Sequence, residues 1–475
     1  MDHDSPSLLW FRQDLRLSDN PALSAAAKHG RPIVAIFILD DENAARWAIG
    51  GASRWWLHCS LVRLDASLRG LGIPLVLRRG PALTVLPALA AEVSAGAVFW
   101  NRCYEPFQVA RDTAIKSALS GAGVRVESLN GSLLVEPWVP KTQAGQPFRV
   151  FTPFWKAMRG LMAPQLPLAV PPPTIPPAKA PPGDALEDWG LQPRKPDWAG
   201  GLRAAWSPGE AGAMAQLEHF LEQGIGRYRS DRDRPGEDSV SRLSPYLHWG
   251  EISVRQVWRA AETYAGPAAE PFLRQLAWRE FSYHLLWQFP DLPERPFNAQ
   301  FSRFPWREDS AALNLWQRGL TGYPLVDAGM RELWTTGWMH NRVRMVTASF
   351  LVKHLLLDWR HGEAWFWDTL VDADLANNAA SWQWVAGSGA DAAPYFRIFN
   401  PVLQGEKFDP DGRYVHRWVP ELAKLPDEFL HKPWLAPANI LKTADVELGG
   451  TYPKPIVDHA VARDRALAAF ATVRT

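Results

Sequence analysis

The chain has 475 residues, of which 47% are hydrophobic and 21% are charged, and its formal net charge is +1. Because compact domains typically contain about 100–200 residues, this length predicts at least two domains. The composition excludes a disordered or collagen-like chain. The small net charge excludes a protein that coats nucleic acid over its whole surface, so any such contact has to be a local patch.

Residues 1–135 alternate strand-like with helix-like segments. The strand-like segments are apolar runs at 7–12, 32–39, 74–79, 97–102 and 124–129. Amphipathic segments such as 52–72 and 107–123 lie between them. Strands and helices that alternate at this spacing predict an α/β domain with a doubly wound parallel sheet.

The organisation changes after this domain. Residues 164–182, PQLPLAVPPPTIPPAKAPP, contain too many prolines for a helix or a central strand, and we expect 136–205 to be an interdomain linker. From 206 to 475 strand-like alternation almost disappears, which predicts an all-α domain. Its expected helices are 271–289, 310–318, 324–336, 340–357 and 361–371. Ser207 and Ser253 are each followed three residues later by Glu or Gln, which predicts two further helix starts with capping boxes.

The sequence contains no motif that predicts metal binding and no segment that predicts membrane insertion. Cys59 and Cys103 cannot form a disulfide framework, and there is no CxxC, HExxH or complete calcium loop, so we expect no metal. The first residues lack the apolar stretch of a signal peptide, and no run approaches the roughly 18 apolar residues of a spanning helix. We therefore expect a cytoplasmic protein without a membrane partner.

One candidate site is the segment 226–250. It lacks the glycine patterns of the common phosphate loops, but it interleaves arginines with Ser239, Ser241 and Ser244 before a helix that we expect Ser244 to cap. Hydroxyls, amides at a helix start and guanidinium groups together suit a diphosphate. A polar surface loop with alternating ion pairs explains the same residues equally well.

Two more clusters have functional and structural readings. Two acids and two amides precede a tryptophan pair in 372–384, where carboxylates could accept ribose hydroxyls, although a helix-capping turn is the simpler explanation. Gln275 and Trp278 share one face of a predicted helix, and Asn341 and Met345 share a face of another. Such a set could form a slot for a flat base, but pattern alone favours core packing for Trp278 and Met345.

Together these segments resemble the photolyase/cryptochrome family, most closely the bacterial cyclobutane pyrimidine dimer photolyases. The resemblance spans nearly the whole chain. It is carried by WFRQDLRLSDNPAL (10–23), YRSDRDRP (228–235), SRLSPYL (241–247), WREF (278–281), TGYPLVDAGMREL (321–333) and the segments 337–360 and 382–409. It implies an antenna-binding α/β domain at 1–135 and a helical FAD- and DNA-binding domain at 206–475.

The resemblance implies FAD as the cofactor and assigns residues to it. The flavin-binding positions are Tyr228, Val240, Ser241, Arg242, Leu243, Ser244, Phe272, Arg279, Trp338, Arg344, Asp372, Ala373, Asp374 and Asn378. Among these, Asn378 matches the residue that faces flavin N5, and Arg344 matches an ion partner of Asp372. The tryptophans Trp382, Trp359 and Trp306 match the family's chain that carries electrons from the surface to the flavin.

DNA containing pyrimidine dimers is the partner that the resemblance implies. Trp278 and Trp384 match residues that flank the flipped-out dimer, and the other matching contacts are Arg232, Gln275, Asn341, Arg342, Met345 and Gln404. The catalytic set would be Gln275, Asn341, Met345 and Asn378. The implied chemistry is light-driven electron donation from reduced FAD, which splits the dimer and makes the protein a deoxyribodipyrimidine photo-lyase.

The chain departs from the family pattern at three places. Gln275 stands where dimer photolyases usually have Glu, and Val240 replaces the usual Thr of the phosphate loop. In YEPFQVARD (104–112), Phe107 and Gln108 replace the Asn and Glu of the best-known folate binders. We expect 5,10-methenyltetrahydrofolate as the antenna, with a deazaflavin or no antenna as the alternatives.

The family also contains proteins with other functions. Photolyases for (6-4) lesions carry a histidine pair where this chain has NRVRM (341–345), although Gln275 leans towards that branch. Plant-type cryptochromes tend to have Asp and Tyr in place of Asn378 and Trp384, and their long output tail has no counterpart here beyond about residue 470. We therefore favour dimer repair over a (6-4) photolyase or a blue-light photoreceptor. Because monomers are usual in the family, we expect a monomer without an obligate protein partner.

Overall fold

The computed structural model describes residues 5–162, 176, 178–392 and 396–474. Contacts divide the chain into two compact units. The first unit comprises Met1–Gly226, Ser241–Pro290 and Val371–Asp374, and the second comprises Arg227–Val240, Asp291–Leu370 and Leu375–Thr475. These units do not follow the order of the chain, so the division at 135 and 205 stays a prediction about sequence segments.

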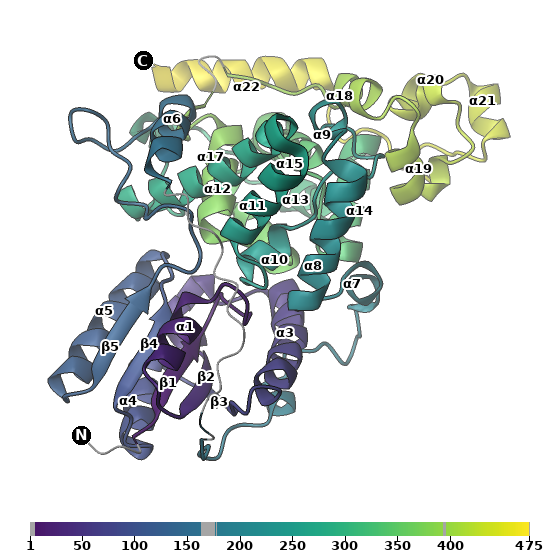
Figure 1. Ribbon diagram of the computed structural model, residues 1–475. Helices are drawn as coiled ribbons and strands as arrows, with labels where there is room; N and C mark the ends of the chain where they lie inside the picture. The colour runs from purple at the N-terminus through teal and green to yellow at the C-terminus, as the bar shows by residue number, and fades with distance from the viewer. Residues whose placement is uncertain (1–4, 163–175, 177, 393–395, 475) are drawn as a thin grey trace. The chain divides into compact units, whose positions relative to one another are not determined.

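The first unit contains a five-stranded parallel sheet, as predicted (Figure 1). Its strands are β1 (Ser7–Phe11), β2 (Ile33–Leu39), β3 (Leu75–Arg79), β4 (Ala97–Asn101) and β5 (Arg125–Leu129), in the order β3-β2-β1-β4-β5. The chain winds outward from β1 in one direction and from β4 in the other. Because parallel crossovers are right-handed, this reversal places helices on both faces of the sheet and confirms the doubly wound fold.

The strands were predictable because their side chains are buried on both faces. Every residue of β1, β2 and β4 is buried. Leu8 and Trp10 pack in one cluster with residues of α4 (Ala82–Glu92) and α5 (Pro106–Gly121). The remaining helices of the α/β part are α1 (Pro21–Lys28), the short α2 (Asp41–Ala44) and α3 (Gly51–Arg69).

Further helices complete the first unit. They are α6 (Phe151–Leu161), α7 (Gly200–Ala205), α8 (Glu210–His219), α10 (Ser244–His248), α11 (Val254–Ala265) and α12 (Glu270–Gln288). Helix α6 lies inside the segment that we expected to be a linker, and it packs against α12 (Figure 1). The proline-rich prediction for 164–182 falls mostly outside the described residues.

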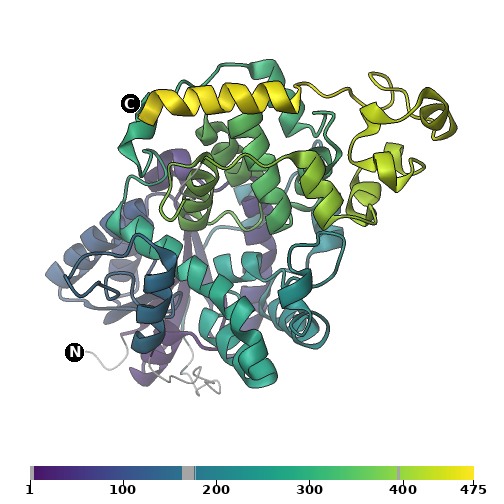
Figure 2. The same cartoon turned by 90° about the horizontal axis from the view of Figure 1, so that it is seen from above.

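The second unit is helical throughout its described residues, which contain isolated bridges but no strand. Its helices are α9 (Tyr228–Asp231), α13 (Ser310–Gln317), α14 (Pro324–Thr336), α15 (Asn341–Ser349), α16 (Trp359–Thr369), α17 (Leu375–Ala386), α18 (Pro401–Phe408), α19 (Arg413–Trp418), α20 (Asp427–Leu430), α21 (Ala438–Thr443) and α22 (His459–Arg474). Figure 2 shows α22, in yellow, lying across other helices of this unit. Together with helices α8, α10, α11 and α12 of the first unit, this confirms the predicted helical C-terminal part.

Of the three serines that we expected to cap helices, the structure confirms only one. The capping box at Ser253 is confirmed, since its hydroxyl and the Gln256 side chain each bond the other's backbone. The prediction for Ser207 is wrong, because Gly209 adopts a φ of +109° and α8 begins at Glu210. The Glu210 carboxylate instead accepts the backbone N–H groups of Leu17 and Ser18. Ser244 is likewise the first residue of α10 and not its cap.

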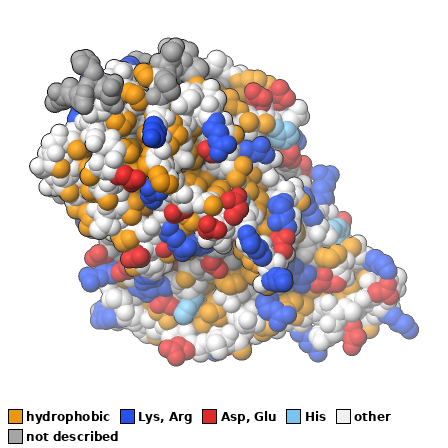
Figure 3. Space-filling view, turned by 90° about the horizontal axis from the view of Figure 1, so that it is seen from below, with side chains coloured by type: hydrophobic (Ala, Val, Ile, Leu, Met, Phe, Trp, Pro, Cys, Tyr) orange, Lys and Arg blue, Asp and Glu red, His pale blue; other side chains and the backbone are white. Residues whose placement is uncertain are grey.

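No helix among the described residues is both long and apolar enough to cross a membrane. On the face drawn in Figure 3, basic and acidic side chains are interspersed. This agrees with the small net charge of the sequence.

Candidate functional site

The acids of 372–374 lie buried among side chains of α10 and α12 within the first unit. The Tyr283 hydroxyl donates to Asp374 Oδ2 at 2.5 Å, and His248 Nδ1 lies 4.0 Å from the same oxygen. Burial raises the pKa of Tyr283 well above its usual value and lowers the pKa of His248, so both side chains are neutral near pH 7. Asp374 is therefore a buried carboxylate beside neutral hydrogen-bonding groups.

Arg279 supplies positive charge beside this cluster. Its guanidinium carbon lies 5.0 Å from the centre of the Tyr283 ring, and Nη1 donates to the Ser132 carbonyl at 3.0 Å. Burial and hydrogen bonds thus hold a cation close to Asp374. Ala373, which lies between the two acids, is itself buried. Buried carboxylates with a fixed cation nearby suit the hydroxyl and N–H groups of a nucleotide cofactor.

The predicted phosphate-side loop has an unusual backbone. Arg242 adopts a φ of +49°, which is uncommon for a residue other than glycine. The Gln216 side chain donates to the Ser241 carbonyl at 3.0 Å, and the Arg242 guanidinium carbon lies 4.5 Å from the centre of the Trp206 ring. These contacts hold the strained backbone of the loop in one conformation, as expected of a segment that binds a ligand. Leu243 is buried beneath it, whereas Ser244 is exposed.

The other predicted flavin positions divide between the units. Phe272 is buried in the first unit, where its ring lies 4.6 Å from that of Phe220. In the second unit, Tyr228 and Trp338 are buried, and Arg344 donates to the Met339 carbonyl at 2.7 Å. Val240 is half-buried in the same unit. The pairing of Arg344 with Asp372 stays a prediction.

Asn378, on α17, is buried and has a fixed orientation. Its Nδ2 donates to the Glu363 carbonyl at 3.0 Å. Within the described residues, its oxygen Oδ1 makes no hydrogen bond. An amide held in this way presents an acceptor, which fits the N–H group that a reduced flavin carries at N5.

The three predicted electron-transfer tryptophans all belong to the second unit. Trp382 and Trp359 are buried, whereas Trp306 is half-buried beside Phe304, with ring centres 4.3 Å apart. None of the three described rings stacks directly on another of the three. Gly362 explains how Trp382 fits, because a Cβ atom at this position would lie 2.0 Å from the indole.

In the first unit, the predicted lesion residues lie on α12. The Gln275 side chain donates weakly to the Pro271 carbonyl at 3.3 Å. Trp278 is half-buried, and its ring stacks on Phe151 with centres 3.8 Å apart and an angle of 7°. One face of Trp278 is therefore covered by Phe151, which lies in the stretch expected to be a linker.

In the second unit, α15 brings two predicted lesion residues together, since Asn341 Nδ2 lies 4.0 Å from Met345 Sδ. Arg342 pairs with Asp233 at 3.0 Å. Helix α18 carries Gln404, whose Oε1 is buried without a hydrogen-bond partner among the described residues.

The two remaining predicted DNA contacts also have fixed surroundings. Trp384 Nε1 donates to the Asp391 carbonyl at 3.1 Å. The guanidinium carbon of Arg232 lies 5.4 Å from the centre of the Tyr228 ring. Each of these side chains is thus oriented by a neighbour within the second unit.

Sequence reasoning missed Tyr283, His248, Asp233 and Phe151. The available signals were weak: Tyr283 follows Arg279 by four residues on one helix, and His248 follows the SRLSPYL motif directly. Their partners Asp374 and Trp278 lie 91 or more residues away along the chain, so no local pattern could identify the contacts.

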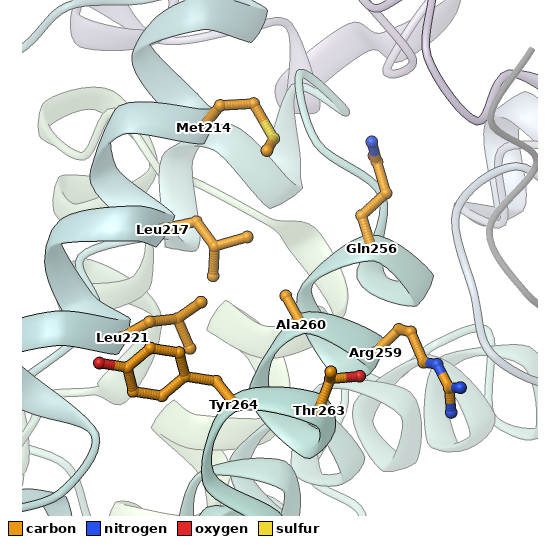
Figure 4. A pocket seen from close by; sticks show the side chains of 8 residues that line it. All are labelled: Met214, Leu217, Leu221, Gln256, Arg259, Ala260, Thr263 and Tyr264. Carbon is orange, nitrogen blue, oxygen red and sulfur yellow. The ribbon is translucent and has the colours of Figure 1, made fainter.

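One surface groove of about 700 Å³ lies between α8 and α11 in the first unit. Figure 4 shows Met214, Leu217 and Leu221 on one side and residues of α11, including Arg259 and Tyr264, on the other. No predicted site residue lines it. The described residues also contain no group of three His, Cys, Asp or Glu side chains that could hold a metal ion.

The parallel sheet with its helices, the mostly helical C-terminal part and the buried acids beside Tyr283 agree with the photolyase-type flavoprotein that the sequence resembles. Residues 7–176 match the family model described as DNA photolyase, and residues 272–472 match the FAD binding domain of DNA photolyase. The chain therefore belongs to the photolyase/cryptochrome family and contains an FAD-binding domain, as the sequence predicted.

Individual relatives agree with this assignment. The chain is 51% identical to a deoxyribodipyrimidine photo-lyase of Agrobacterium fabrum, over 99% of this chain and 98% of the relative. The crystal structure of a bacterial class III photolyase from Agrobacterium tumefaciens matches with a TM-score of 0.95 at 51% identity, covering 100% of this chain and 98% of the other. Cryptochrome-1 of Arabidopsis thaliana is 41% identical over 96% of this chain and 69% of its own length. Relatives thus include both the enzyme class that the sequence predicted and a cryptochrome.

Proposed function

We propose that this protein is a deoxyribodipyrimidine photo-lyase that splits cyclobutane pyrimidine dimers in DNA by light-driven electron transfer from reduced FAD. The observation that carries the proposal is the 51% identity, over almost the full length of both chains, to a relative with that name. The chemistry of the described residues supports it in each part of the site.

The donor set fits FAD. Asp372 and Asp374 would accept hydrogen bonds from the cofactor, with the Tyr283 hydroxyl fixing the second carboxylate and Arg279 supplying positive charge near it. Ser241, Arg242 and Ser244 would face its diphosphate, and Asn378 would face N5 with its oxygen as the acceptor. Phe272, Trp338 and the remaining predicted positions would form the walls. When bound and reduced, FAD supplies the electron that light makes available to the dimer.

The chain's own residues would recognise the lesion and supply electrons. Trp278 and Trp384 would flank the flipped dimer, and Gln275, Asn341 and Met345 would contact its base edges. Arg232, Arg342 and Gln404 would contact the DNA strand. Trp306, Trp359 and Trp382 would pass electrons from the surface to an oxidised flavin, since indole is more easily oxidised than aliphatic side chains.

The remaining features of the proposal follow the family resemblance. The antenna would be 5,10-methenyltetrahydrofolate, with a deazaflavin or none as alternatives. The protein would act as a cytoplasmic monomer without an obligate protein partner.

A blue-light photoreceptor is the second candidate, because Arabidopsis thaliana cryptochrome-1 is 41% identical to 96% of this chain. Asn378 and Trp384 favour repair over this second candidate, because plant-type cryptochromes tend to have Asp and Tyr at these two positions. The two functions differ in what light does to damaged DNA.

One experiment separates them. Reduced protein is mixed with an oligonucleotide that contains a thymine dimer and is exposed to blue light, while absorbance near the base band is followed. Repair predicts a light-dependent gain in absorbance that is absent in the dark and with undamaged DNA. A protein that binds FAD but produces no such gain would be assigned to the photoreceptor class.

A further inference from the structure

Two buried tyrosines of the first unit each donate a hydrogen bond to a carboxylate. The Tyr283 hydroxyl donates to Asp374 Oδ2 at 2.5 Å, and the Tyr104 hydroxyl donates to Glu136 Oε2 at 3.0 Å. Burial raises the pKa of both hydroxyls well above the usual value of a tyrosine. Each tyrosine therefore keeps its proton near neutral pH and has an acceptor for that proton within hydrogen-bonding distance.

The rings of these two tyrosines also meet. The centres of the Tyr283 and Tyr104 rings lie 6.1 Å apart, and the ring planes are inclined at 78°. Two half-buried tryptophans continue the set, since the centre of the Tyr104 ring lies 6.3 Å from that of Trp138 and 6.5 Å from that of Trp287. A series of neighbouring aromatic rings thus leads from the buried Asp374 to side chains that solvent reaches.

An arginine lies beside each of the two tyrosine–carboxylate pairs. Arg102 donates to the other oxygen of Glu136 at 2.5 Å, and the guanidinium carbon of Arg279 lies 5.0 Å from the centre of the Tyr283 ring. A fixed positive charge beside the ring disfavours an oxidised tyrosine that keeps its proton, because that species is a cation. An electron therefore leaves Tyr283 at low cost only if the hydroxyl proton moves to the carboxylate at the same time, since this creates no new buried charge.

A buried tyrosine–carboxylate pair also occurs in the second unit, where the Tyr452 hydroxyl donates to Asp327 at 2.7 Å. The need to satisfy a buried hydroxyl explains such a pair when it stands alone. Tyr283 and Tyr104 differ in two respects. Their two pairs meet ring to ring, and one of the two acids, Asp374, is a predicted FAD-binding residue.

We propose that Tyr283 and Tyr104 act in series as a proton-coupled electron donor to FAD when the oxidised flavin is excited by blue light. Tyr283 gives one electron to the flavin and its hydroxyl proton passes to Asp374, which leaves a neutral radical beside a neutral acid. Tyr283 then regains an electron from Tyr104 and the proton from Asp374, while the Tyr104 proton passes to Glu136. The inference rests on the proposed function only in placing FAD beside Asp374.

The oxidised Tyr104 is restored from outside the protein. A thiolate in solution supplies one electron through the half-buried Trp138 and becomes a thiyl radical, and the proton on Glu136 returns to Tyr104. This route lies within the first unit, whereas the predicted tryptophan chain lies in the second. The protein therefore keeps a source of electrons for oxidised flavin when the tryptophan chain is interrupted.

The test looks for a tyrosyl radical in protein that holds oxidised FAD and carries Trp382→Phe, which closes the tryptophan chain. Samples without DNA are frozen under blue light, and their electron paramagnetic resonance spectra are recorded with ordinary and with ring-deuterated tyrosine incorporated. W382F should give a tyrosyl signal that narrows on deuteration, and W382F/Y283F should lose this signal. The signal of W382F should form more slowly in D₂O than in H₂O, because the proton moves with the electron.

Tyr104→Phe is a second variant, which keeps the hydrogen bond between Tyr283 and Asp374 and serves if Y283F disturbs folding. W382F/Y104F should still form the radical, but the radical should decay faster in the dark because it stays on Tyr283 beside the flavin. The matched control is Tyr452→Phe, which removes a buried tyrosine–carboxylate hydrogen bond from the second unit. W382F/Y452F should give the same signal as W382F.

The outcomes separate the inference from the function on which it rests. A tyrosyl signal that is absent from W382F, or that persists in W382F/Y283F, would overturn the inference while chemically reduced protein still repairs DNA in the light. Equal radical lifetimes in W382F and W382F/Y104F would overturn the role of Tyr104. Equal loss of signal in W382F/Y452F and W382F/Y283F would mean that any buried tyrosine bond has this effect, which would also overturn it. Failure of reduced wild type to repair a thymine dimer would overturn the proposed function, and the radical measurement would stand because it uses no DNA.

Discussion

Gln275 is the single residue at which this chain departs most clearly from the pattern of dimer photolyases. Its Nε2 donates to the Pro271 carbonyl one turn earlier on α12. This leaves the oxygen Oε1 as a neutral acceptor for the base edges of a lesion. A glutamate would offer two acceptors and a negative charge, and hydrogen bonds to charged groups are stronger than neutral ones.

We therefore predict that Gln275→Glu tightens binding of dimer-containing DNA. The expected gain is about 1 kcal/mol, or about fivefold in Kd, the difference between a charged and a neutral hydrogen bond. It is measured in the dark with damaged and undamaged oligonucleotides, and only the damaged one should respond. An unchanged or weaker affinity would mean that Gln275 does not contact the dimer.

Trp306 allows a second prediction for a single residue. Because it is half-buried, it is suited to be the outer member of the tryptophan chain. Trp306→Phe should slow photoreduction of oxidised flavin, while repair by chemically reduced protein stays largely intact. The measurement is the loss of oxidised-flavin absorbance under blue light. Trp434→Phe, which removes an indole that contacts Tyr323 outside the predicted chain, is the control. Equal loss of photoreduction and repair would contradict the assignment.

Among the secondary-structure elements, those with a strong local pattern were predicted well. The strands and the helices α12, α13 and α14 lie within one or two residues of their expected bounds. The expected helix 340–357 instead ends at Ser349, continues as a π-helical turn over Phe350–His354 and is broken near Leu356, which has a φ of +55°. Helix α6 was missed because the prolines of 164–182, which follow it, led us to expect a linker over the whole of 136–205.

Contacts between distant segments explain why the start of α8 was predicted wrongly and why some site residues were not predicted at all. The Glu210 carboxylate bonds backbone groups 192 and 193 residues away, so its role could not be read from the local Ser-Pro-Gly-Glu pattern. The family resemblance identified Asp374 and Trp278. It did not reveal Tyr283 or Phe151, because their importance comes from contacts between distant segments.

The stack between α6 and α12 leads to a prediction about element packing. Phe151→Leu removes the ring that supports one face of Trp278, so it should weaken binding of the dimer by about 1 kcal/mol beyond its effect on stability. Phe151→Tyr should restore binding. The control is Phe154→Leu, a buried phenylalanine on the same helix that contacts Phe281 and His284 but does not stack on Trp278. Equal binding defects in the two leucine variants would show that Phe151 acts through stability alone.

Stability of the whole molecule depends on a carboxyl group buried far from the surface. Glu251 is fully buried in the first unit and accepts hydrogen bonds from Ser60 Oγ at 2.5 Å, the Gly209 N–H at 2.7 Å and Trp56 Nε1 at 3.2 Å. These bonds join α3 to the turns before α8 and α11. Despite them, burial raises the pKa of Glu251 from 4.5 to about 8.

The raised pKa of Glu251 determines how the stability of the folded protein changes with pH. The folded protein holds the Glu251 proton between about pH 4.5 and 8 while the unfolded chain releases it, so stability falls as pH rises through this window. Relative to that of Glu251→Gln, the urea midpoint of the wild type should decrease from about pH 5 to about pH 8.5. Below about pH 5, Glu251→Gln should be less stable than the wild type, because an amide N–H faces Trp56, and its profile should be flatter as the pH rises. Parallel profiles for the two proteins would contradict the raised pKa.

The first unit draws on three separate stretches of the chain, and this has a practical consequence. Its Trp56–Glu251, Asp19–Arg255 and Phe151–Trp278 contacts all join residues before position 206 to residues after it. Two polypeptides that correspond to 1–205 and 206–475 would each contain only part of this core. When co-expressed, they should co-purify as a complementing pair, and neither should be recovered in soluble form when expressed alone.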